Sequence, residues 1–429
     1  MIINKREIWS QMKDSLQLYS EEVNENRALP AIEDGLKPSG RQLLYCLYKN
    51  KFFSNKPYTK SANAIGLTMA SYYPHGDAPL GDVLSNLSMA WKHNAPLIDF
   101  HGGLGSVDNP TATAAPRYTE CRLSRYAEQL IGDLKNELSE EMWEDNYLQT
   151  EQIPKRFPGN FPNLLINENL GIGWACAGSW LPHNLSDITQ LIEYYSNTQT
   201  LSEIFPSFPG GGGIIINGGD LPMIYKTGKG TIYLKAKYQI NNNTFTITEL
   251  PYRVGPKKIL QQIEEAKENN AAWALNIVEA YDNSTMGKTE LIITQRKLDE
   301  ESLLKATLLA TTFSVNMTAL VNGKPKLVNL EYIVQYYLER QHSRILQKAL
   351  KLKEIAKFKK HELEGFITIL PALDQAIKII KQSNSKVEAS IALCAEFNIT
   401  SEQAAAILGL KLSQLTQKGI SEVQEEIEI

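Results

Sequence analysis

Cysteine is scarce in this sequence, and long apolar runs are missing. The 429 residues include four cysteines with no paired or metal-ligand spacing, namely Cys46, Cys121, Cys176 and Cys394. No apolar stretch is long enough to span a membrane, and the polar residues 4–7 lack the apolar core of a signal peptide. These absences favour a protein of the reducing cytoplasm and argue against a secreted disulfide scaffold or a membrane protein.

A strong net charge is also lacking, but the charge is unevenly distributed. The formal charge is −4, which by itself gives no reason to expect a nucleic-acid partner. Residues 27–60, however, contain seven Lys or Arg and two acidic residues, a local balance of +5. The end of the chain, from Glu422 onward, contains four glutamates and no basic residue. A local basic region on a near-neutral chain is typical of a protein that contacts phosphates over part of its surface.

The length of the chain predicts several domains, because 429 residues exceed what one hydrophobic core usually organises. Residues 5–25 have apolar side chains near helical spacing and predict an amphipathic helix. The patterns that follow divide the rest of the chain at about residues 150 and 325. We therefore expect four parts, which are 1–25, 26–150, 151–325 and 326–429.

Residues 26–150 predict helices over 41–49, 61–69 and 79–92, the last two joined by the turn Tyr72–Asp77. The G-x-x-x-x-G spacing of residues 35–40 is similar to a phosphate loop. Arg41 and Gln42 replace the Lys and Ser/Thr that such a loop needs, and Pro38 removes one N–H. We interpret it as a turn that presents Lys37 and Arg41 to a phosphate backbone.

Residues 151–325 change in character. Pro154, Pro158 and Pro162 predict a linker. Ile172 lies between two glycines, and it is either a core residue or an exposed wedge that enters between base pairs. Segments 231–237 and 244–250 alternate with period two and are predicted to be paired strands, followed by a helix over 257–268 and a strand over 290–294. This part is predicted to be an α+β domain.

Residues 326–429 are predicted to be helical. An apolar stripe from Ile333 to Leu363, interleaved with basic residues, predicts a helix of about 35 residues that serves as an arm or coiled coil. The sequence Thr400-Ser-Glu-Gln403 predicts a capping box that opens a helix over 403–410.

Arg117 and Tyr118 are the strongest candidates for chemistry. A tyrosine oxygen is a poor nucleophile at neutral pH because its pKa is about 10. A neighbouring guanidinium favours the phenolate and can bind an anionic centre through two parallel hydrogen bonds. The pair therefore suits attack on a phosphodiester. The alternative is a half-buried surface tyrosine with an arginine stacked on its ring.

Several motifs occur in an order that resembles one known family. These are the segment from Arg27 to Arg41, Lys60-Ser-Ala-Asn63, Tyr73-Pro-His-Gly-Asp77, and the segment from Asp99 to Ser106 that leads into Arg117-Tyr118. Their order and spacing resemble the breakage-reunion, or A-type, subunit of type IIA DNA topoisomerases: DNA gyrase, topoisomerase IV and their phage equivalents. The resemblance extends from about residue 15 to about residue 417.

The resemblance implies an α+β multidomain fold. It implies an N-terminal helical arm (1–25), a winged-helix DNA-cleavage domain (26–150), an α/β tower (151–325), and a coiled coil with a helical dimer gate (326–429). Residues 404–415 resemble the gate, which we expect to be abbreviated unless the chain is a truncated fragment. No β-propeller follows residue 429, so relaxation and decatenation are expected rather than negative supercoiling.

The resemblance also implies an activity, that of an ATP-dependent type II topoisomerase. Tyr118 would attack a DNA phosphorus and become linked to the 5′ end, and Arg117 would stabilise the transition state. His75 would contact the scissile phosphate, with Arg27, Lys37 and Arg41 positioning it. Ile172, Lys60 and Ser61 would contact DNA. Ala78 and Asp82 would occupy drug-contact positions, and Ala78 replaces the usual Ser or Thr, which predicts weak fluoroquinolone sensitivity.

The implied cofactors are Mg²⁺ and ATP, both bound by a partner. The sequence contains no Glu with a following Asp-x-Asp pair and no nucleotide-binding motif. The resemblance assigns both to a B-type subunit in an A2B2 complex built on a homodimer and double-stranded DNA, in the bacterial nucleoid or a phage-infected cell. The alternatives are a DNA-binding relative that has lost cleavage, a truncated breakage-reunion fragment, and a tyrosine recombinase or nicking enzyme.

Overall fold

The structure, a computed structural model, describes residues 8–285 and 288–409. Helices and several sheets are mixed along the chain, and one helix extends over 40 residues, so the prediction of mixed α and β structure with a long helix is confirmed. The chain forms two compact units, Met1–Arg344 and Ile345–Ile429. The winged-helix and tower assignments and the four-part division stay predictions. No helix in the described ranges is long and apolar enough to cross a membrane.

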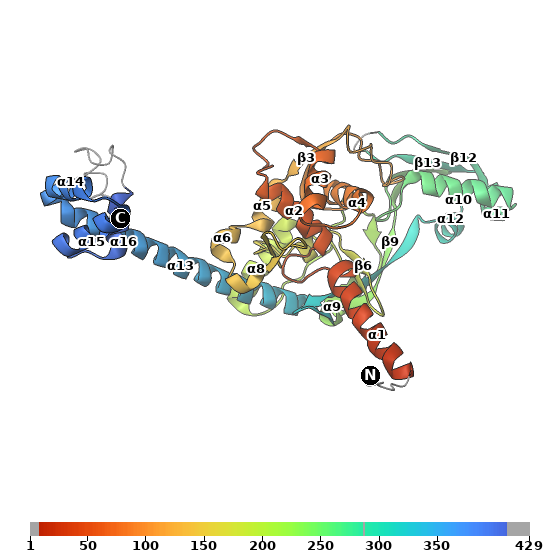
Figure 1. The fold of residues 1–429 in the computed structure, drawn as a ribbon. Coiled ribbons are helices and arrows are strands. Elements are labelled where there is room, and N and C mark those ends of the chain that lie inside the picture. Colours follow the sequence, from red (N-terminus) through yellow and green to blue (C-terminus); the bar gives the residue numbers. More distant parts are fainter. Residues whose placement is uncertain (1–7, 286–287, 410–429) are drawn as a thin grey trace. The chain divides into compact units, whose positions relative to one another are not determined.

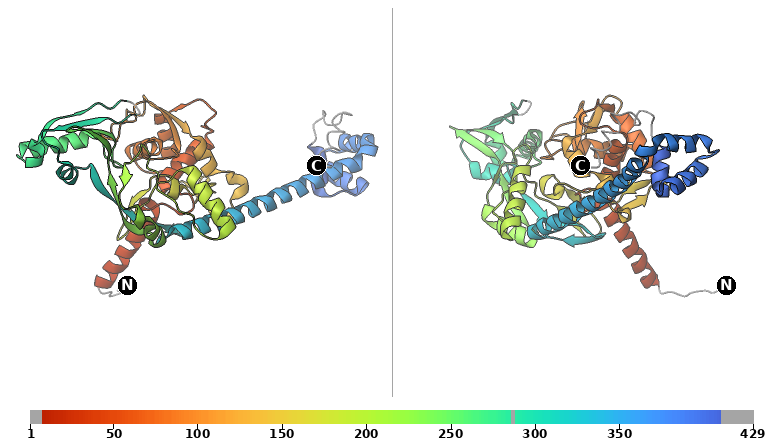
Figure 2. Two further views of the ribbon diagram at one scale, coloured as in Figure 1. Left: turned by 180° about the vertical axis from the view of Figure 1, so that it is seen from behind. Right: turned by 90° about the vertical axis from the view of Figure 1, so that its left-hand side faces the viewer.

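The first unit begins with helix α1 (Ile8–Val23), which continues into a π-helix, η1 (Asn24–Ala28). The amphipathic helix predicted over residues 5–25 is confirmed from residue 8 onward. None of the residues of α1, all of which the structure describes, is buried. Figures 1 and 2 show α1, in red, extending away from the body of the first unit. Its apolar side chains, Trp9 among them, are therefore exposed.

Three helices and a small sheet follow. The helices are α2 (Pro38–Lys49), α3 (Ser61–Ser71) and α4 (Asp77–Ser88), and the antiparallel sheet has the order β1 (Thr59–Lys60), β3 (Glu120–Leu123), β2 (Ile98–His101). The three predicted helices are confirmed, with shifted ends. Helix α2 begins at Pro38, earlier than predicted, because the first helical position tolerates a residue without an N–H.

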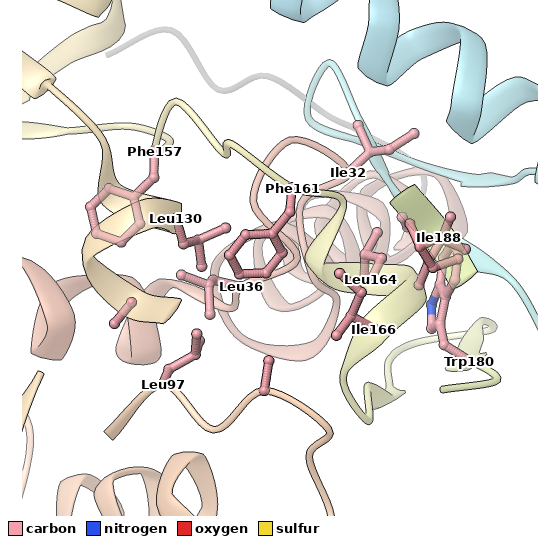
Figure 3. Close-up of a cluster of buried hydrophobic side chains, with 14 of the residues drawn as sticks. Ile32, Leu36, Leu97, Leu130, Phe157, Phe161, Leu164, Ile166, Trp180 and Ile188 are labelled. Carbon is pink, nitrogen blue, oxygen red and sulfur yellow. The ribbon is translucent and has the colours of Figure 1, made fainter. Parts of the chain in front are cut away.

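The proline-containing segment 154–162 is part of the core, so the prediction of a linker was wrong. Phe157 and Phe161 are buried, and Figure 3 shows them packed with Leu36 and Leu130, which come from segments far apart in the sequence. The prolines alternate here with large apolar side chains, whose burial dominates the energetics of the segment. The same core cluster extends from Ile32 to Val334.

The first unit also contains two larger sheets. One has the order β6 (Leu170–Ile172), β7 (Ala177–Ser179), β14 (Ala310–Asn316), β9 (Lys229–Lys235), β8 (Ile214–Ile215). The other has the order β10 (Lys237–Asn241), β11 (Thr244–Glu249), β13 (Leu291–Gln295), β12 (Ile277–Asp282), and has its own core.

The predicted pairing of segment 231–237 with segment 244–250 was wrong. Strand β9 pairs with β14 and β8, whereas β11 pairs with β10 and β13. The partner of β11 is the short strand β10, joined to it by a tight turn in which Asn242 has a φ of 56°. Only the buried Ala236 separates β9 from β10. The strand and helix predicted over 290–294 and 257–268 are confirmed as β13 and α10 (Pro256–Glu268).

The remaining elements of the first unit are α5 (Arg125–Ile131), α6 (Leu134–Glu137), η2 (Glu140–Met142), β4 (Trp143–Asp145), β5 (Gln152–Pro154), α7 (Asn163–Ile166), α8 (Leu185–Thr198), η3 (Gly218–Asp220), α9 (Leu221–Thr227), α11 (Ala272–Leu275), α12 (Glu300–Ala306), β15 (Thr318–Val321) and β16 (Lys324–Leu327).

The long helix α13 (Leu330–Ile369) begins in the first unit and ends in the second. The second unit also contains η4 (Leu370–Ala372), α14 (Leu373–Gln382), α15 (Lys386–Phe397) and α16 (Ser401–Leu408), around a core that includes Phe366 and Leu393. The predicted capping box is confirmed: Thr400 Oγ1 accepts from the Gln403 N–H at 3.3 Å, and Gln403 Oε1 accepts from the Thr400 N–H at 3.0 Å. The dimer gate predicted over 404–415 lies partly outside the described residues.

Candidate active site

Tyr118 lies in a turn held against the N-terminus of α3. Its N–H donates to the Ala115 carbonyl at 2.9 Å. The flanking carbonyls of Pro116 and Thr119 accept from the N–H groups of Ala62 and Ser61 at 3.1 and 3.0 Å. These N–H groups belong to the first turn of α3, where helical partners are missing, so the turn satisfies them. The backbone on both sides of Tyr118 is thereby fixed to the helix.

The Tyr118 side chain is 67% exposed, and Arg117 is also exposed. The guanidinium carbon of Arg117 lies 4.6 Å from the centroid of the Tyr118 ring. The alternative of a half-buried tyrosine is therefore wrong about burial, although the predicted stacking is present. Because the ring face is covered and the side chain is otherwise open, a large ligand can reach the phenol.

The loop before Tyr118 is closed at its base and anchored at its tip. Gly102 and Gly105 have φ values of 128° and 87°, which residues with a side chain rarely adopt. The Ala114 N–H donates to the Gly103 carbonyl at 2.8 Å and closes the base of the loop. At the tip, Asp108 Oδ1 accepts from the Lys257 N–H at 2.9 Å. Asp108 therefore caps α10, whose own N-cap residue, Gly255, has no side chain to do so.

Arg41 is only 4% exposed, so the prediction that it is presented to a DNA backbone was wrong. Its Nε and Nη2 donate to the two carboxylate oxygens of Asp34 at 2.6 and 2.9 Å. Burial acts to raise the pKa of Asp34, but the charge and hydrogen bonds of Arg41 outweigh it and lower that pKa. A cation buried among apolar side chains requires a partner of opposite charge. Asp34, an acidic residue in a mainly basic segment, was the sequence signal that could have indicated this ion pair.

A polar cavity of about 540 Å³ adjoins this ion pair. His75 lines it from the turn before α4, together with one edge of Arg41 and with Lys155 and Arg156. The His75 ring meets the Tyr73 ring edge-on at 4.7 Å between centroids. Neither Tyr118 nor Arg117 lines this cavity. Sequence reasoning missed Lys155 and Arg156, although two consecutive basic residues beside Pro154 were a usable signal.

The other predicted contact residues differ in exposure. Ser61 is 1% exposed, and its oxygen accepts from Thr119 Oγ1 at 2.8 Å, so the prediction that its side chain contacts DNA was wrong. Lys60 is exposed and pairs with Glu120 at 2.8 Å. Arg27 is exposed on η1. Lys37 is partly buried, and burial lowers the pKa of its ammonium group.

Ile172 lies at the tip of the β6–β7 hairpin and is 80% exposed. This exposure removes the core alternative, because a core isoleucine would be covered on all sides. The side chain stands next to the hairpin turn, in which Ala175 has a φ of 57°. Its geometry is compatible with a wedge, and its contact with DNA stays a prediction.

Comparison with known proteins gives a family for this arrangement. The sequence profile of the A-type subunit of DNA gyrase/topoisomerase IV matches residues 27–429. The chain belongs to this family.

Curated relatives in the family come from both enzymes. The A-type subunit of DNA topoisomerase 4 from Streptococcus pyogenes serotype M6 is 34% identical over 426 residues, covering 95% of this chain and 51% of the relative. The A-type subunit of DNA gyrase from Staphylococcus epidermidis is 31% identical over 440 residues (99% and 49%), and that from Metamycoplasma arthritidis is 34% identical over 435 residues (97% and 48%). The chain thus spans about half the length of the relatives it matches.

The drug-contact positions carried over from the family, Ala78 and Asp82, are both exposed on α4. Their spacing of four residues places them on the same face of the helix. Ala78 offers a methyl group where a hydroxyl would offer a hydrogen bond. The weak drug response predicted from Ala78 stays a prediction.

The described residues do not fit a magnesium ion. No group of three or more His, Cys, Asp or Glu in residues 8–285 and 288–409 could hold a metal. We therefore derive no step of the chemistry through a metal on this chain. The assignment of Mg²⁺ and ATP to a B-type subunit stays a prediction from the family resemblance.

Proposed function

We propose that the chain is the DNA cleavage and religation subunit of a type II topoisomerase, with Tyr118 as the nucleophile. The observation that carries this proposal is the exposed Tyr118 ring, covered on one face by Arg117 and fixed by its backbone to α3. Membership of the family independently favours DNA as the substrate. An exposed phenol beside a cation suits attack on a phosphodiester.

The proposed reaction is a transesterification. The Tyr118 oxygen forms a bond to a DNA phosphorus, and the bond from phosphorus to the 3′ oxygen breaks. The phenolic proton is lost, the departing 3′ oxygen takes up a proton, and the 5′ end stays linked to Tyr118. Religation reverses these steps without a new source of energy. Arg117 stabilises the negative charge that grows on the phosphate oxygens in the transition state.

The cavity that contains His75 is lined by charges of both signs, since His75, Lys155 and Arg156 lie beside Glu25, Glu33 and Glu144, and Arg156 is paired with Glu33 at 3.6 Å. We propose that His75 and Lys155 are its phosphate-binding groups. Since Tyr118 does not line this cavity, we propose that the two parts of the site meet across a homodimer. Two nucleophiles related by a two-fold axis would also explain how both strands are cut. Arg41 then acts from within the ion pair with Asp34, shaping the cavity wall, and Arg27, Lys37 and Lys60 contribute positive charge near the DNA.

The proposed partners are double-stranded DNA and a B-type subunit that brings Mg²⁺ and ATP in an A2B2 complex. Bound Mg²⁺ would neutralise charge at the leaving oxygen. This chain's part is to bind the duplex, to bend it with Ile172, and to hold the nucleophile. Relaxation and decatenation in the bacterial or phage-infected cytoplasm are the proposed outcomes.

A covalent-complex assay tests the proposal. The chain is mixed with a B-type subunit, Mg²⁺, ATP and catenated circles, and protein linked to DNA is trapped with detergent. We expect trapping and decatenation, both abolished by Tyr118→Phe and retained by Tyr126→Phe, a matched change at another exposed tyrosine. DNA binding without trapping in the unchanged chain would instead indicate a relative that has lost cleavage. Trapping that survives Tyr118→Phe would reject the nucleophile.

A further inference from the structure

The hairpin that carries Ile172 is held by one side chain from another part of the chain. Asn24 Oδ1 accepts from the Trp174 N–H at 2.8 Å, and Asn24 Nδ2 donates to the Trp174 carbonyl at 3.2 Å. The Asn24 side-chain amide thus pairs with both backbone groups of one residue, as a neighbouring strand would. Asn24 itself is only 7% exposed, so water competes poorly for these bonds.

The glycines on either side of Ile172 are explained by this contact. A Cβ on Gly173 would lie 2.2 Å from Asn24 Oδ1, and a Cβ on Gly171 would lie 2.5 Å from the Ala28 carbonyl oxygen. Neither glycine has a positive φ, so backbone conformation does not require glycine there. Space requires it, because the hairpin presses against η1 on both sides of Ile172.

The contact also connects the hairpin to α1. Asn24 is the first residue of η1, which continues directly from α1. One turn earlier, the Tyr19 ring meets the Trp174 ring edge-on, with 5.8 Å between centroids. A π-helix at such a junction leaves the regular hydrogen-bond pattern and redirects side chains, which is frequent at functional sites. The orientation of α1 is therefore linked to the hairpin through Asn24.

We propose that Asn24 is a positioning residue that fixes the hairpin tip so that Ile172 enters the duplex in one orientation. This inference rests on the proposed function, since it assumes that Ile172 acts on DNA. Pushing a side chain between base pairs unstacks them at a cost in free energy, and a rigid support avoids the further cost of ordering the hairpin on binding. With Trp174 held at both backbone groups, the turn after Ile172 cannot rotate away from the DNA.

Energy transfer across a short duplex measures the effect. The duplex carries a donor dye at one end and an acceptor at the other, and it is bound by the full chain reconstituted with a B-type subunit and Mg²⁺. We expect Asn24→Ala to lower the ratio of bent to straight DNA by about tenfold, because two hydrogen bonds are lost. Asn24→Asp keeps the acceptor for the Trp174 N–H but places a buried carboxylate oxygen against the Trp174 carbonyl oxygen, so its loss should be at least as large.

A double-mutant cycle of Asn24→Ala and Gly173→Ala tests whether Asn24 and Gly173 act through one contact. Gly173→Ala alone should impair bending, because its methyl group displaces the Asn24 amide. In the Asn24→Ala background the only close neighbour given for the new methyl group is Cys176 Sγ, at 3.1 Å, so adding Gly173→Ala should cause little further loss. Additive losses would reject the proposed contact. Asn197→Ala and Gly218→Ala, an exposed asparagine and an uncrowded glycine, are the matched controls and should bend DNA normally.

Ile172→Ala separates positioning from general stability. Once the wedge is gone, Asn24→Ala should change bending no further, although it still lowers the melting temperature. Bending that falls again would show that Asn24 does not act through Ile172. If the unchanged complex leaves energy transfer unaltered, the wedge and this inference are both rejected. Trapping of DNA on Tyr118, scored in parallel, decides the proposed function independently.

Discussion

The guanidinium carbon of Arg117 lies 4.6 Å from the centroid of the neighbouring Tyr118 ring. Consecutive residues of an extended strand would point to opposite faces, and the turn closed by the Tyr118 N–H and the Ala115 carbonyl brings the two side chains together. The cation covers the face of the ring and leaves its hydroxyl edge free. The pair can therefore act as one unit, with the phenol attacking and the guanidinium stabilising charge.

Replacement of Arg117 should slow cleavage while leaving DNA binding nearly intact. For Arg117→Ala we expect the rate of covalent complex formation to fall by about 100-fold or more, a magnitude typical of losing one donor to a developing negative charge. Arg117→Lys keeps the charge but loses the planar, two-pronged donor, so its loss should be smaller. Single-turnover trapping measures the rate. Equal losses in duplex affinity and in rate would show that Arg117 serves binding only.

Breaking the ion pair between Arg41 and Asp34 should destabilise the first unit strongly. Asp34→Asn keeps the shape of the side chain but leaves a buried guanidinium unpaired, and we expect a loss of about 3–5 kcal/mol in the free energy of unfolding. Adding Arg41→Met removes the second charge, so the double variant should be more stable than Asp34→Asn alone. Urea unfolding measures both. A double variant less stable than either single variant would contradict the buried-pair interpretation.

The cap that Asp108 provides to α10 should matter for local stability. Asp108→Ala removes the acceptor for the Lys257 N–H and should cost about 1 kcal/mol, the usual effect of losing an N-cap. Asp108→Asn retains an acceptor and should cost less. Hydrogen exchange at the Lys257 amide is the measurement, and faster exchange is expected only in the alanine variant. Unchanged protection would mean that another group caps the helix.

Stability should fall in mild acid because of His183. Its Nδ1 lies 2.7 Å from the Leu165 carbonyl oxygen and its Nε2 lies 2.8 Å from the Tyr225 hydroxyl, and burial lowers its pKa to about 4. In the unfolded chain the pKa is about 6.5, so between these values the unfolded state binds the extra proton. Folding stability is then constant above about pH 6.5 and decreases toward pH 4 by up to about 1.4 kcal/mol per pH unit.

Urea unfolding of the His183→Gln variant checks this. The variant should be less stable at neutral pH but should lose less stability between about pH 7 and about pH 5. A residual slope is expected from His93, because burial lowers its pKa to about 4 as well. An unaltered slope in the variant would rule out His183 as the titrating group.

The drug response should depend on residue 78. We expect Ala78→Ser to lower the fluoroquinolone concentration needed for half-maximal trapped cleavage by up to about tenfold, the effect of one added hydrogen bond. Pro79→Ala, a change at the next exposed residue of α4, is the matched control. A serine variant with the sensitivity of the unchanged chain would show that this position does not contact the drug.

Local patterns predicted α1, α2, α3, α4, α10, α13 and α16, because the spacing of apolar residues and the capping and turn signals are local information. They gave no prediction for others, among them α8 and α15. Strand pairing and burial are non-local and were harder to predict. Strand β11 was assigned the wrong neighbour because β10 is short and lies between the two segments that alternate clearly. The segment 154–162 was taken for a linker because its prolines were weighed above Phe157 and Phe161, which form part of the core.

In the candidate site, too, local features were predicted better than burial and long-range contacts. The motifs singled out Arg117, Tyr118 and His75, and the structure places all three in exposed turns, of which only the turn at Tyr72–Asp77 was predicted; their roles stay predictions. Burial of Arg41 and Ser61 could not be read from charge or polarity, since it depends on Asp34 and Thr119. Asn24 gave no local signal, because its partner Trp174 is 150 residues away.

Strands β9 and β10 are consecutive in the chain but belong to different sheets with different cores, and Ala236 alone connects them. The Ala236 N–H also donates to the Leu309 carbonyl at 2.7 Å, so the junction is tied to a second segment. This junction has little slack: a mechanical load on either sheet passes to the other through Ala236 and through residues 296–309, which join β13 to β14. A fluorescent tag or peptide inserted at Ala236 would lengthen the shorter of these two connections, whereas the turn at Asn242 offers an insertion point within one hairpin.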